Sequence, residues 1–477
     1  MTTTFNPEIF REYDIRGIAD RDLTDPVIER LGRAFARYLQ PAGINTVTVG
    51  YDARLSSPRL RDALTSGLTA AGIDVIDVGL CPTPALYFSL YHLKPRGGIM
   101  ITGSHNPAEF NGFKLCVGKD TIYGEEIQKL RRIMEDLQTA DGRQQTAGRS
   151  GKISQHPIVP HYAEHLKGLF REYRDVPIKV VLDSGNGTAG LAAPGIIRSM
   201  GCDVTELYSE PDGRFPNHHP DPTIPMNLET LISTVKRESA DFGVAFDGDS
   251  DRIGIVDEQG TVLWGDQLMV LFSRDILADR PGAMFVSEVK CSQTMYDDIR
   301  KHGGSAIMWK TGHSLIKAKM KETGAALAGE MSGHIFFADR YFGFDDAIYA
   351  ACRVVELLKK TRSEKRSRIP LSSLLADLPK TFNTPEIRFD CPDALKFKVV
   401  EQVQQIYAAP GTVSLPIREV ITVDGIRAVF EKGWGLIRAS NTQPVLVMRF
   451  EAVDRASLQA IRALMEEQVR KVIADLS

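Results

Sequence analysis

The stretch Ile178-Lys179-Val180-Val181-Leu182-Asp183 is a short β-branched run that leads into the glycine-rich turn 184–190. Comparable runs are Thr46-Val47-Thr48-Val49-Gly50-Tyr51 and Met284-Phe285-Val286-Ser287, each followed by a polar turn and then by helical patterning. Short apolar runs that alternate with amphipathic stretches are typical of α/β layers with a largely parallel sheet. We therefore expect an α/β protein with a weak threefold repeat of one domain type.

Composition changes along the chain indicate where domains end. The polar stretch 139–154 resembles a linker, and the turn sequence 257–260 separates two apolar runs. The basic segment 359–368 is interpreted as a solvated connection. After it come a strand, a helix, several strands and a closing helix over 455–476, which predicts a smaller α+β domain. The predicted domains are 1–153, 154–258, 259–369 and 370–477.

Composition also limits the partners. Of 477 residues, 43% are hydrophobic and 25% charged, with a formal charge of −3, as in ordinary globular proteins. Nucleic-acid and membrane-surface proteins need a broad basic field, so neither partner is expected. The six cysteines form no Cys-x-x-Cys pair, and neither a signal pattern nor an apolar run of membrane-spanning length occurs. We expect a cytoplasmic protein.

Ser104 lies in Thr102-Gly103-Ser104-His105-Asn106-Pro107, directly after the apolar run 98–101. Loops that leave the carboxyl ends of strands carry the chemistry of α/β folds. Ser, Asn and Pro also favour plain turns, so this stretch alone has two interpretations. A serine hydrolase would require Gly-x-Ser-x-Gly, which is missing. The Ser104 hydroxyl is therefore a candidate without a hydrolase context.

Three carboxylates follow the apolar run 242–246, at Asp247, Asp249 and Asp251. In an extended loop these alternate positions face one way, and the like charges need a cation between them. A hard ion such as Mg²⁺ is the expected ligand. A calcium loop is the alternative, because Glu258 would occupy its twelfth position, but Arg252 stands where that loop needs Gly.

A second alternative comes from Gly185-Asn186-Gly187-Thr188-Ala189-Gly190, which matches G-x-G-x-x-G after a strand. Glu206 lies near the distance expected of a ribose partner, so an NAD-dependent dehydrogenase is a second hypothesis. The lone pattern is weak, because glycines after a strand often only let a helix start close to the sheet. We rank this hypothesis below the phosphoryl transfer that the loops described next indicate.

Two further loops carry polar groups suited to a phosphorylated sugar. Gly-bracketed side chains able to bind sugar hydroxyls are Glu330, Ser332 and His334. The second loop offers an arginine fork with hydroxyl and amide donors, a combination suited to phosphate; its members are Arg438, Ser440, Asn441 and Thr442. His218 and His219 are neighbours in a Pro-bounded loop and are given no ligand role.

Together these segments resemble the α-D-phosphohexomutase family over nearly the whole chain, most closely its bacterial phosphomannomutase/phosphoglucomutase branch. Supporting stretches are 13–17, 309–313 and 433–442. The resemblance implies three related α/β/α sandwich domains with mixed, largely parallel sheets and a smaller C-terminal α+β domain around a central cleft. It also implies an isomerase that moves phosphate between O6 and O1 of mannose and glucose phosphates. The phosphate passes through a phosphoserine and a hexose 1,6-bisphosphate.

The resemblance assigns roles residue by residue. Ser104 is implied as the phosphorylated residue and a contact of Mg²⁺, which Asp247, Asp249 and Asp251 hold. Lys114 and His334 are candidates for proton transfer, and Arg252 for charge neutralisation. Implied substrate contacts are Tyr13, Arg16, Lys290, His313, Glu330, Ser332, His334, Arg438, Ser440, Asn441 and Thr442. A mutase restricted to one sugar remains an alternative, and we expect a monomer with a small phosphosugar as its only partner.

Overall fold

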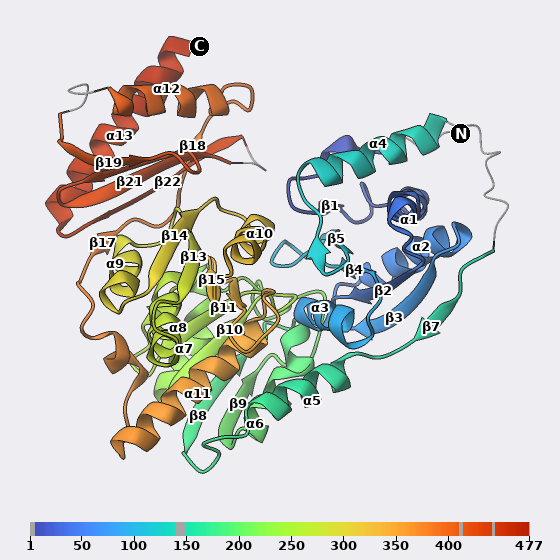
Figure 1. Cartoon of the computed structure of the whole chain (residues 1–477), viewed down its shortest axis with the longest axis horizontal. Coiled ribbons are helices and arrows are strands. Elements are labelled where there is room, and N and C mark those ends of the chain that lie inside the picture. The colour runs from blue at the N-terminus through green and yellow to red at the C-terminus, as the bar shows by residue number, and fades with distance from the viewer. Residues whose placement is uncertain (1–4, 140–148, 410–413, 441–443, 477) are drawn as a thin grey trace. The chain divides into compact units, whose positions relative to one another are not determined.

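A computed structural model gives the fold, and it describes residues 5–139, 149–409, 414–440 and 444–476 (Figure 1). The chain divides into two compact units. The first comprises Met1–Asp275 and Ser332–Leu375, and the second comprises Ile276–Met331 and Ala376–Ser477. The described residues form four β-sheets. No helix among them is both long and apolar enough to cross a bilayer.

The first sheet of unit one is mixed. Its order is β1 (Ile15–Ile18), β5 (Phe110–Val117), β4 (Gly97–Ile101), β2 (Thr46–Tyr51), β3 (Asp74–Leu80) and β7 (Ile153–Gln155), with β6 (Asp120–Thr121) beside β5. Strands β4, β2, β3 and β7 run parallel, whereas β5 is antiparallel to its neighbours. The strand predicted over 46–51 is confirmed.

Helices cover both faces of this sheet. Val47 and Val49 belong to the core formed with α1 (Asp25–Leu39), α2 (Ser57–Ala70) and α4 (Glu125–Thr139). Strand residues alternate faces, so Thr48 points the other way. There its hydroxyl lies 3.0 Å from the Ser89 hydroxyl of α3 (Thr83–His92). The predicted α/β/α sandwich is therefore confirmed here.

The second sheet of unit one has the order β12 (Val262–Leu263), β11 (Ile253–Asp257), β10 (Phe242–Phe246), β8 (Ile178–Asp183) and β9 (Cys202–Leu207). Strands β10, β8 and β9 are parallel, and β11 and β12 are antiparallel. The turn predicted at 257–260 is present, with Gly260 at a φ of 84°. This turn joins two strands of one sheet. The associated helices are α5 (Val159–Leu169), α6 (Ala193–Ser199), α7 (Glu229–Arg237) and α11 (Ala347–Lys365). Helix α8 (Gly265–Asp279) follows β12, and the short strand β16 (Ile335–Phe337), which precedes α11, belongs to another sheet.

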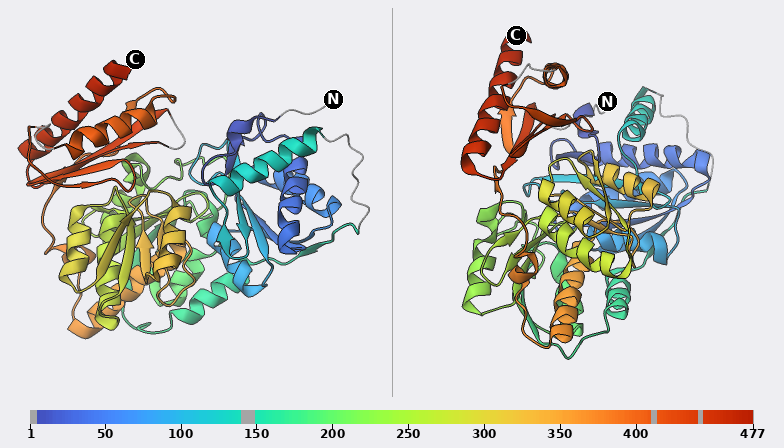
Figure 2. Two further views of the ribbon diagram at one scale, coloured as in Figure 1. Left: turned by 45° about the horizontal axis from the view of Figure 1, so that its top comes forward. Right: turned by 60° about the vertical axis from the view of Figure 1, so that its left-hand side comes forward.

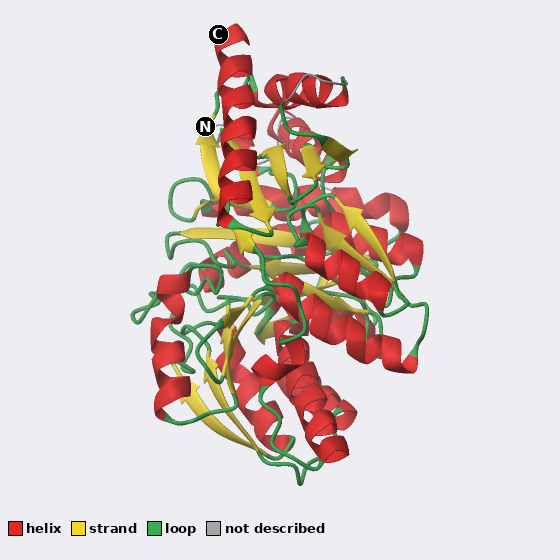
Figure 3. Cartoon of the chain, turned by 90° about the vertical axis from the view of Figure 1, so that its left-hand side faces the viewer, coloured by secondary structure: helices red, strands yellow, loops and turns green. Residues whose placement is uncertain are grey.

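In unit two, β13 (Met284–Glu288) pairs in parallel with β14 (Ser305–Trp309) and β15 (Leu327–Gly329), alongside α9 (Gln293–Lys301) and α10 (His313–Thr323). Unit two also contains the C-terminal sheet. Its strand order is β17 (Phe382–Asn383), β22 (Val445–Ala452), β21 (Gly433–Ala439), β20 (Ile426–Phe430) and β19 (Ile417–Ile421), and β18 (Ile387–Asp390) also pairs with β22. Helices α12 (Lys396–Ala408) and α13 (Arg455–Leu476) pack on one face of this sheet (Figures 2 and 3). The expected α+β tail is therefore confirmed.

Short 3-10 turns complete the described elements. They lie at Pro7–Ile9, Gln40–Ala42, Thr188–Leu191, Pro225–Leu228 and Leu371–Leu375.

Two connecting segments differ from expectation. The last residues of the predicted linker 139–154 belong to β7. This strand pairs in parallel with β3 and forms the edge of the first sheet. The basic segment 359–368 is not a solvated connection. Most of it continues α11, with Lys359 and Arg362 buried. Charge alone misled the interpretation, because the carbonyl and carboxylate partners of these side chains lie far away in sequence.

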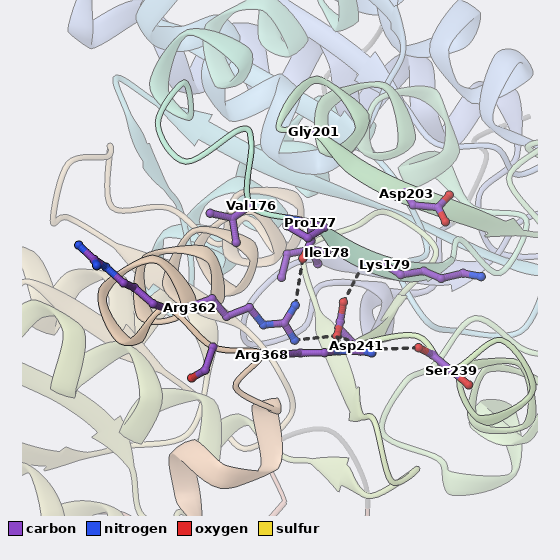
Figure 4. A pocket seen from close by; sticks show the side chains of 12 residues that line it. Val176, Pro177, Ile178, Lys179, Gly201, Asp203, Ser239, Asp241, Arg362 and Arg368 are labelled. Atoms are coloured by element: carbon purple, nitrogen blue, oxygen red, sulfur yellow. Dashed lines mark hydrogen bonds and ion pairs between the residues drawn. The ribbon is translucent and has the colours of Figure 1, made fainter.

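Arg362 and Arg368 converge on Asp241 at the edge of a cavity of about 660 Å³ (Figure 4). Their guanidinium groups lie 2.6 and 2.9 Å from one Asp241 oxygen, and the Lys179 amide donates to the other at 2.8 Å. Burial opposes the charge of the carboxylate, but the Arg362 and Lys179 hydrogen bonds outweigh it and lower the pKa of Asp241. This clamp is at the start of β8 and β10, opposite the strand ends that carry the acidic loop.

Candidate functional site

Ser104 lies in a tight loop after β4. It adopts a φ of 49°, its side chain is buried, and its amide donates to Thr102 Oγ1 at 2.8 Å. A left-handed conformation is uncommon for residues other than glycine and tends to occur where surrounding structure fixes it. The loop therefore holds the Ser104 hydroxyl in one orientation.

Arg54 fixes that loop, and no motif in the sequence pointed to it. Its buried guanidinium donates to the carbonyl oxygens of Ser104 (2.7 Å), Asn106 (2.5 Å), Pro107 (2.5 Å) and Phe110 (2.8 Å). A Cβ placed on Gly103 would lie 2.5 Å from the Arg54 guanidinium carbon, so only glycine leaves room for this arrangement. Arg54 is thus a positioning residue for the serine loop.

Asp247, Asp249 and Asp251 form a buried carboxylate cluster in the turn between β10 and β11. One oxygen from each lies within 4.8 Å of the others, as alternation in an extended loop predicts. Burial and then the two neighbouring carboxylates raise the pKa of Asp247 well above its usual value. Ser250 points away, with its hydroxyl 3.0 Å from that of Thr188.

The structure brings Ser104 to this cluster across 143 residues of sequence. Ser104 Oγ donates to Asp247 Oδ2 at 2.8 Å. His105 Nδ1 also lies 3.1 Å from Ser104 Oγ. Burial, followed by the nearby Arg252 and Arg16 charges, lowers the pKa of His105 well below its usual value, so this imidazole is neutral at pH 7. The sequence placed His105 in the motif without assigning it a role.

Lys114 supplies a positive charge to the same cluster. Its ammonium donates to Asp249 at 2.8 Å and makes a shorter contact with Asp251. Burial works against the charge, but Asp249 and Asp251 outweigh it and raise the pKa of Lys114. A lysine with a raised pKa stays protonated, and it therefore acts first as a charge partner.

The chemistry of this donor set fits a divalent cation. Three buried carboxylates face a single ammonium, and Asp249 Oδ1 and Asp251 Oδ1 have no hydrogen-bond partner among the described residues. Buried carboxylate oxygens are normally paired or bound to a metal. Carboxylate oxygen is the ligand that hard ions prefer. The calcium-loop alternative is not supported. Glu258 accepts a hydrogen bond from the Ser372 amide at 3.2 Å, and the acidic loop is flanked by strands, whereas an EF-hand calcium loop lies between helices.

The glycine-rich loop 185–190 supports this acidic turn. The Thr188 amide donates to the Gly248 carbonyl at 3.1 Å, and a Cβ on Gly187 would lie 2.6 Å from that oxygen. Glu206, the supposed ribose partner, lies in β9 and pairs with Arg198 at 2.5 Å. The glycines are thus explained by close backbone approach, which removes the basis of the dehydrogenase hypothesis.

His334 and Arg252 lie beside the acidic cluster. Arg252 Nε donates to His334 Nε2 at 3.0 Å, while His334 Nδ1 lies 3.2 Å from the buried carboxylate of Asp345. A neutral histidine that accepts at Nε2 carries its proton on Nδ1. The Asp345 carboxylate is thus placed next to the nitrogen that carries the proton, and no sequence pattern had indicated it.

The first strand brings Arg16 to the serine loop. Arg16 donates to Asn106 Oδ1 at 3.1 Å and also pairs closely with Asp14. Tyr13, which precedes β1, is partly buried. Ser332 follows β15 in a turn and is partly exposed. The structure thus brings Arg16 to Ser104's loop.

In unit two, Glu330 accepts a hydrogen bond from the Gly312 amide at 2.7 Å, next to His313 at the start of α10. Lys290 Nζ lies 3.2 Å from Glu386 and 3.6 Å from Glu288. Burial acts against its charge, but Glu288 and then Glu386 outweigh it and raise the pKa of Lys290. Glu330 and Lys290 are therefore held by contacts within this unit.

Asp424 links the phosphate loop to this group. Its Oδ2 accepts from Arg438 Nε at 2.9 Å and from the Thr311 amide at 3.0 Å. The Ser440 amide donates to the Val445 carbonyl at 3.0 Å. Asn441 and Thr442 lie outside the described residues. Asp424 is another residue that no motif indicated, because it comes from a turn with no repeat or spacing pattern.

Comparison with known proteins agrees with this arrangement. Profiles described as phosphoglucomutase/phosphomannomutase α/β/α domains I, II and III match residues 7–141, 160–260 and 264–382, and the C-terminal domain matches 386–468. The chain is 45% identical over 470 residues to a phosphomannomutase/phosphoglucomutase of Pseudomonas putida, covering 98% of this chain and 96% of that protein.

It is also 43% identical to a phosphoglucomutase of Neisseria gonorrhoeae, covering 95% of each. A crystal structure of a phosphoglucomutase/phosphomannomutase family protein from Burkholderia thailandensis superposes with a TM-score of 0.88, at 40% identity and 98% coverage of both chains. These relatives are named as mutases, a group of isomerases. The chain belongs to the phosphoglucomutase/phosphomannomutase family of phosphohexomutases.

Proposed function

We propose that this enzyme reversibly moves phosphate between O6 and O1 of a hexose, with Ser104 as the phosphate carrier. The observation that carries the proposal is the 2.8 Å hydrogen bond from Ser104 Oγ to Asp247, inside a buried cluster of three carboxylates. The hydrogen bond directs the hydroxyl at the carboxylates that would hold a cation, where phosphoryl transfer to and from Ser104 needs its charge neutralised. The names of the relatives support the same chemistry.

Asp247, Asp249 and Asp251 would hold one Mg²⁺, together with an oxygen of phosphorylated Ser104. When bound, the ion neutralises charge on the transferring phosphoryl group. The unpaired oxygens of Asp249 and Asp251 support this assignment. Lys114 then contributes a further fixed positive charge at the same cluster.

In the proposed reaction, a sugar hydroxyl oxygen bonds to phosphorus as the bond between phosphorus and Ser104 Oγ breaks. The hydroxyl proton passes to a base, and the product is a hexose 1,6-bisphosphate, which returns its other phosphate to Ser104 after turning around. Such transfers depend mainly on positioning and charge stabilisation. Of the two proton-transfer candidates, the raised pKa of Lys114 favours His334. His334 can accept at Nε2 once Arg252 turns to the phosphate.

Further residues are assigned to the substrate. Glu330 and Ser332 are assigned to the O3 and O4 hydroxyls, which mannose and glucose share. The proposed phosphate and sugar contacts are Tyr13, Arg16, Lys290, His313, His334, Arg438, Ser440, Asn441 and Thr442. Because none of these assignments reads the O2 epimer, we infer that both sugars are accepted. A strong preference in kcat/KM for one sugar 1-phosphate over the other would favour the one-sugar alternative.

We further propose four functional domains, at 1–153, 154–258, 259–369 and 370–477, in a monomeric enzyme of carbohydrate metabolism. The matched family profiles support the number of domains. All six cysteines are buried free thiols, a pattern suited to the reducing cytoplasm. Light scattering of the purified enzyme tests the monomer.

Peptide mapping tests the carrier directly. The enzyme is incubated with glucose 1,6-bisphosphate and digested, and one phosphate is expected on the peptide that contains Ser104. Ser104→Ala should lose this phosphate and sustained turnover while keeping the fold by circular dichroism. Phosphate on another peptide, or normal turnover by Ser104→Ala, would overturn the proposal.

A further inference from the structure

Three histidines gather away from the acidic cluster, in a part of the fold that the proposed reaction does not use. His92 is the last residue of α3, His156 follows β7, and His161 lies in the first turn of α5. Helices α3 and α5 contact one another (Figure 1). The ring of His161 lies 4.9 Å from those of both His92 and His156. Helix α3 and the segment 155–161 thus bring three imidazoles to one point.

The backbone around these histidines is fixed by the sheet. The His156 amide donates to Asp77 O at 2.8 Å, and the Ile158 amide donates to Val78 O at 3.2 Å. Both bonds attach the segment that enters α5 to strand β3. The His156 and His161 positions therefore do not depend on a loose loop.

One nitrogen in the cluster lacks the partner that its burial requires. His156 Nε2 is buried without a hydrogen bond among the described residues, whereas His92 and His161 are exposed. A buried polar atom left unpaired destabilises a protein unless a ligand satisfies it. The three rings pack on one another, and the His92 ring also packs on Phe88 with ring centroids 5.2 Å apart. This packing explains why the rings are close, but it gives His156 Nε2 no hydrogen-bond partner.

We propose that His92, His156 and His161 form a binding site for a transition-metal ion of the Zn²⁺ class. One nitrogen from each imidazole lies within 4.8 Å of the others. The cluster contains no carboxylate, and imidazole nitrogens suit zinc, copper or nickel, whereas Mg²⁺ and Ca²⁺ prefer oxygen.

The spacing requires only a small contraction. A point equidistant from three atoms at the 4.8 Å limit lies about 2.8 Å from each, compared with about 2.0–2.1 Å for a zinc–imidazole bond. Rotation of the exposed His92 and His161 side chains can close this difference. A water molecule would take the fourth position. The bound ion would tie the end of α3 to the start of α5.

Zinc titration of the full-length enzyme tests the site. The protein is stripped of metal and then saturated with Mg²⁺, so that the aspartate cluster is occupied, and Zn²⁺ binding is followed by calorimetry. We expect one Zn²⁺ per chain, and His92→Gln and His161→Gln should each weaken binding at least about tenfold. His302→Gln is the matched control, because His302 is exposed like His92 and His161 but follows α9 in the other unit.

A spectroscopic measurement identifies the ligands. Cu²⁺ bound to the Mg²⁺-saturated enzyme should show nitrogen hyperfine coupling in electron paramagnetic resonance, and the double variant His92→Gln/His161→Gln should lose it. The absence of Zn²⁺ binding would overturn the proposal. Binding that both single variants retain would also overturn it, because the ion would then occupy another site.

Discussion

The guanidinium of Arg54 donates a hydrogen bond of 2.7 Å to the carbonyl oxygen of Ser104. The same group holds the carbonyl oxygens of Asn106 and Pro107, at 2.5 Å each. A buried planar cation with several donors thus sets the backbone of the loop that presents the proposed carrier hydroxyl.

Arg54→Lys should therefore impair both stability and phosphate loading. Lysine keeps the charge, but its three N–H donors lie on one nitrogen. It therefore cannot donate to all four carbonyl oxygens that the two terminal nitrogens of Arg54 contact. Loss of buried hydrogen bonds predicts destabilisation by about 3 kcal/mol and roughly tenfold slower phosphorylation of Ser104. Urea unfolding and rapid-quench phosphorylation measure the two effects.

Arg59→Lys is the control for this substitution. Arg59 also donates to backbone carbonyls, those of Ala19 and Leu23, but its side chain is 34% exposed. We expect a change below about 1 kcal/mol and normal phosphorylation. Equal effects of the two substitutions would show that Arg54 has no special link to Ser104.

The local elements and the acidic loop could be predicted from sequence because their signals are local. The apolar run 178–183 is β8, the run 46–51 is β2, and the closing helix spans 455–476 as expected. The spacing of Asp247, Asp249 and Asp251 likewise placed three carboxylates on one side of a turn. Each inference needed only the period of an extended chain or a helix.

Arg54, Asp345 and Asp424 could not be found in this way. Arg54 acts on Ser104, 50 residues away, and Asp424 on Thr311, 113 residues away. Asp345 lies nearer to its partner His334, but none of the three stands in a recurring spacing. The burial of Lys359 and Arg362 was missed for the same reason. Only tertiary contacts distinguish a buried cation with fixed carbonyl partners from a solvated one.

Asp345→Asn should slow catalysis with little effect on substrate binding. The carboxylate of Asp345 faces His334 Nδ1 at 3.2 Å. A carboxylate can only accept a hydrogen bond from Nδ1, whereas the amide of the substituted side chain can donate one to it. The imidazole would then carry its proton on Nε2, where it would face the N–H donor of Arg252. We expect kcat to fall roughly 10–100-fold, with KM changed less than about threefold.

The matched control is Asp298→Asn, because Asp298 faces His302 Nδ1 at 3.3 Å in unit two. Its kinetics and its pH–rate profile should match those of the wild type. A rise in KM without a fall in kcat for Asp345→Asn would contradict the orienting role of Asp345.

Removal of Mg²⁺ should abolish turnover and lower thermal stability. Lys114 still pairs with Asp249 and Asp251 when the metal is absent, so the protein stays folded but loses the free energy of Mg²⁺ binding. Mg²⁺ at about 100 times its Kd should add about 2.7 kcal/mol. Melting curves with EDTA and with added Mg²⁺ measure this shift.

Asp249→Asn should lose this Mg²⁺-dependent shift and at least about 100-fold in kcat. Asp257→Asn is the control, because Asp257 is also buried but caps the far end of β11. It should keep the full shift. A Mg²⁺ shift that persists in Asp249→Asn would place the metal elsewhere.

Arg438→Ala should raise KM for the sugar phosphate by roughly 10–100-fold, while kcat changes less. Asp424 holds Arg438 Nε at 2.9 Å, which fixes the plane of the guanidinium for bidentate binding of a phosphate. Steady-state kinetics with glucose 1-phosphate measure the change. Arg462→Ala, on the exposed face of α13, serves as the control. An unchanged KM would refute the phosphate assignment.

Asp241→Asn should destabilise the protein by about 3 kcal/mol at pH 7, because it leaves Arg362 buried without its carboxylate partner. The pKa of Asp241 is lowered in the folded state. Its contribution to stability is therefore complete above the unfolded pKa of about 3.9 and is lost as pH falls through the folded value.

The difference in unfolding free energy between wild type and Asp241→Asn should thus stay constant from pH 7 to about pH 5 and shrink below about pH 4. Denaturant unfolding at a series of pH values measures it. Asp203→Asn is the matched control, since Asp203 lines the same cavity but is exposed and should have little effect at any of these pH values. A difference that grows on acidification would have the wrong sign for a lowered pKa, and the Arg362–Asp241 clamp would then not stabilise the fold.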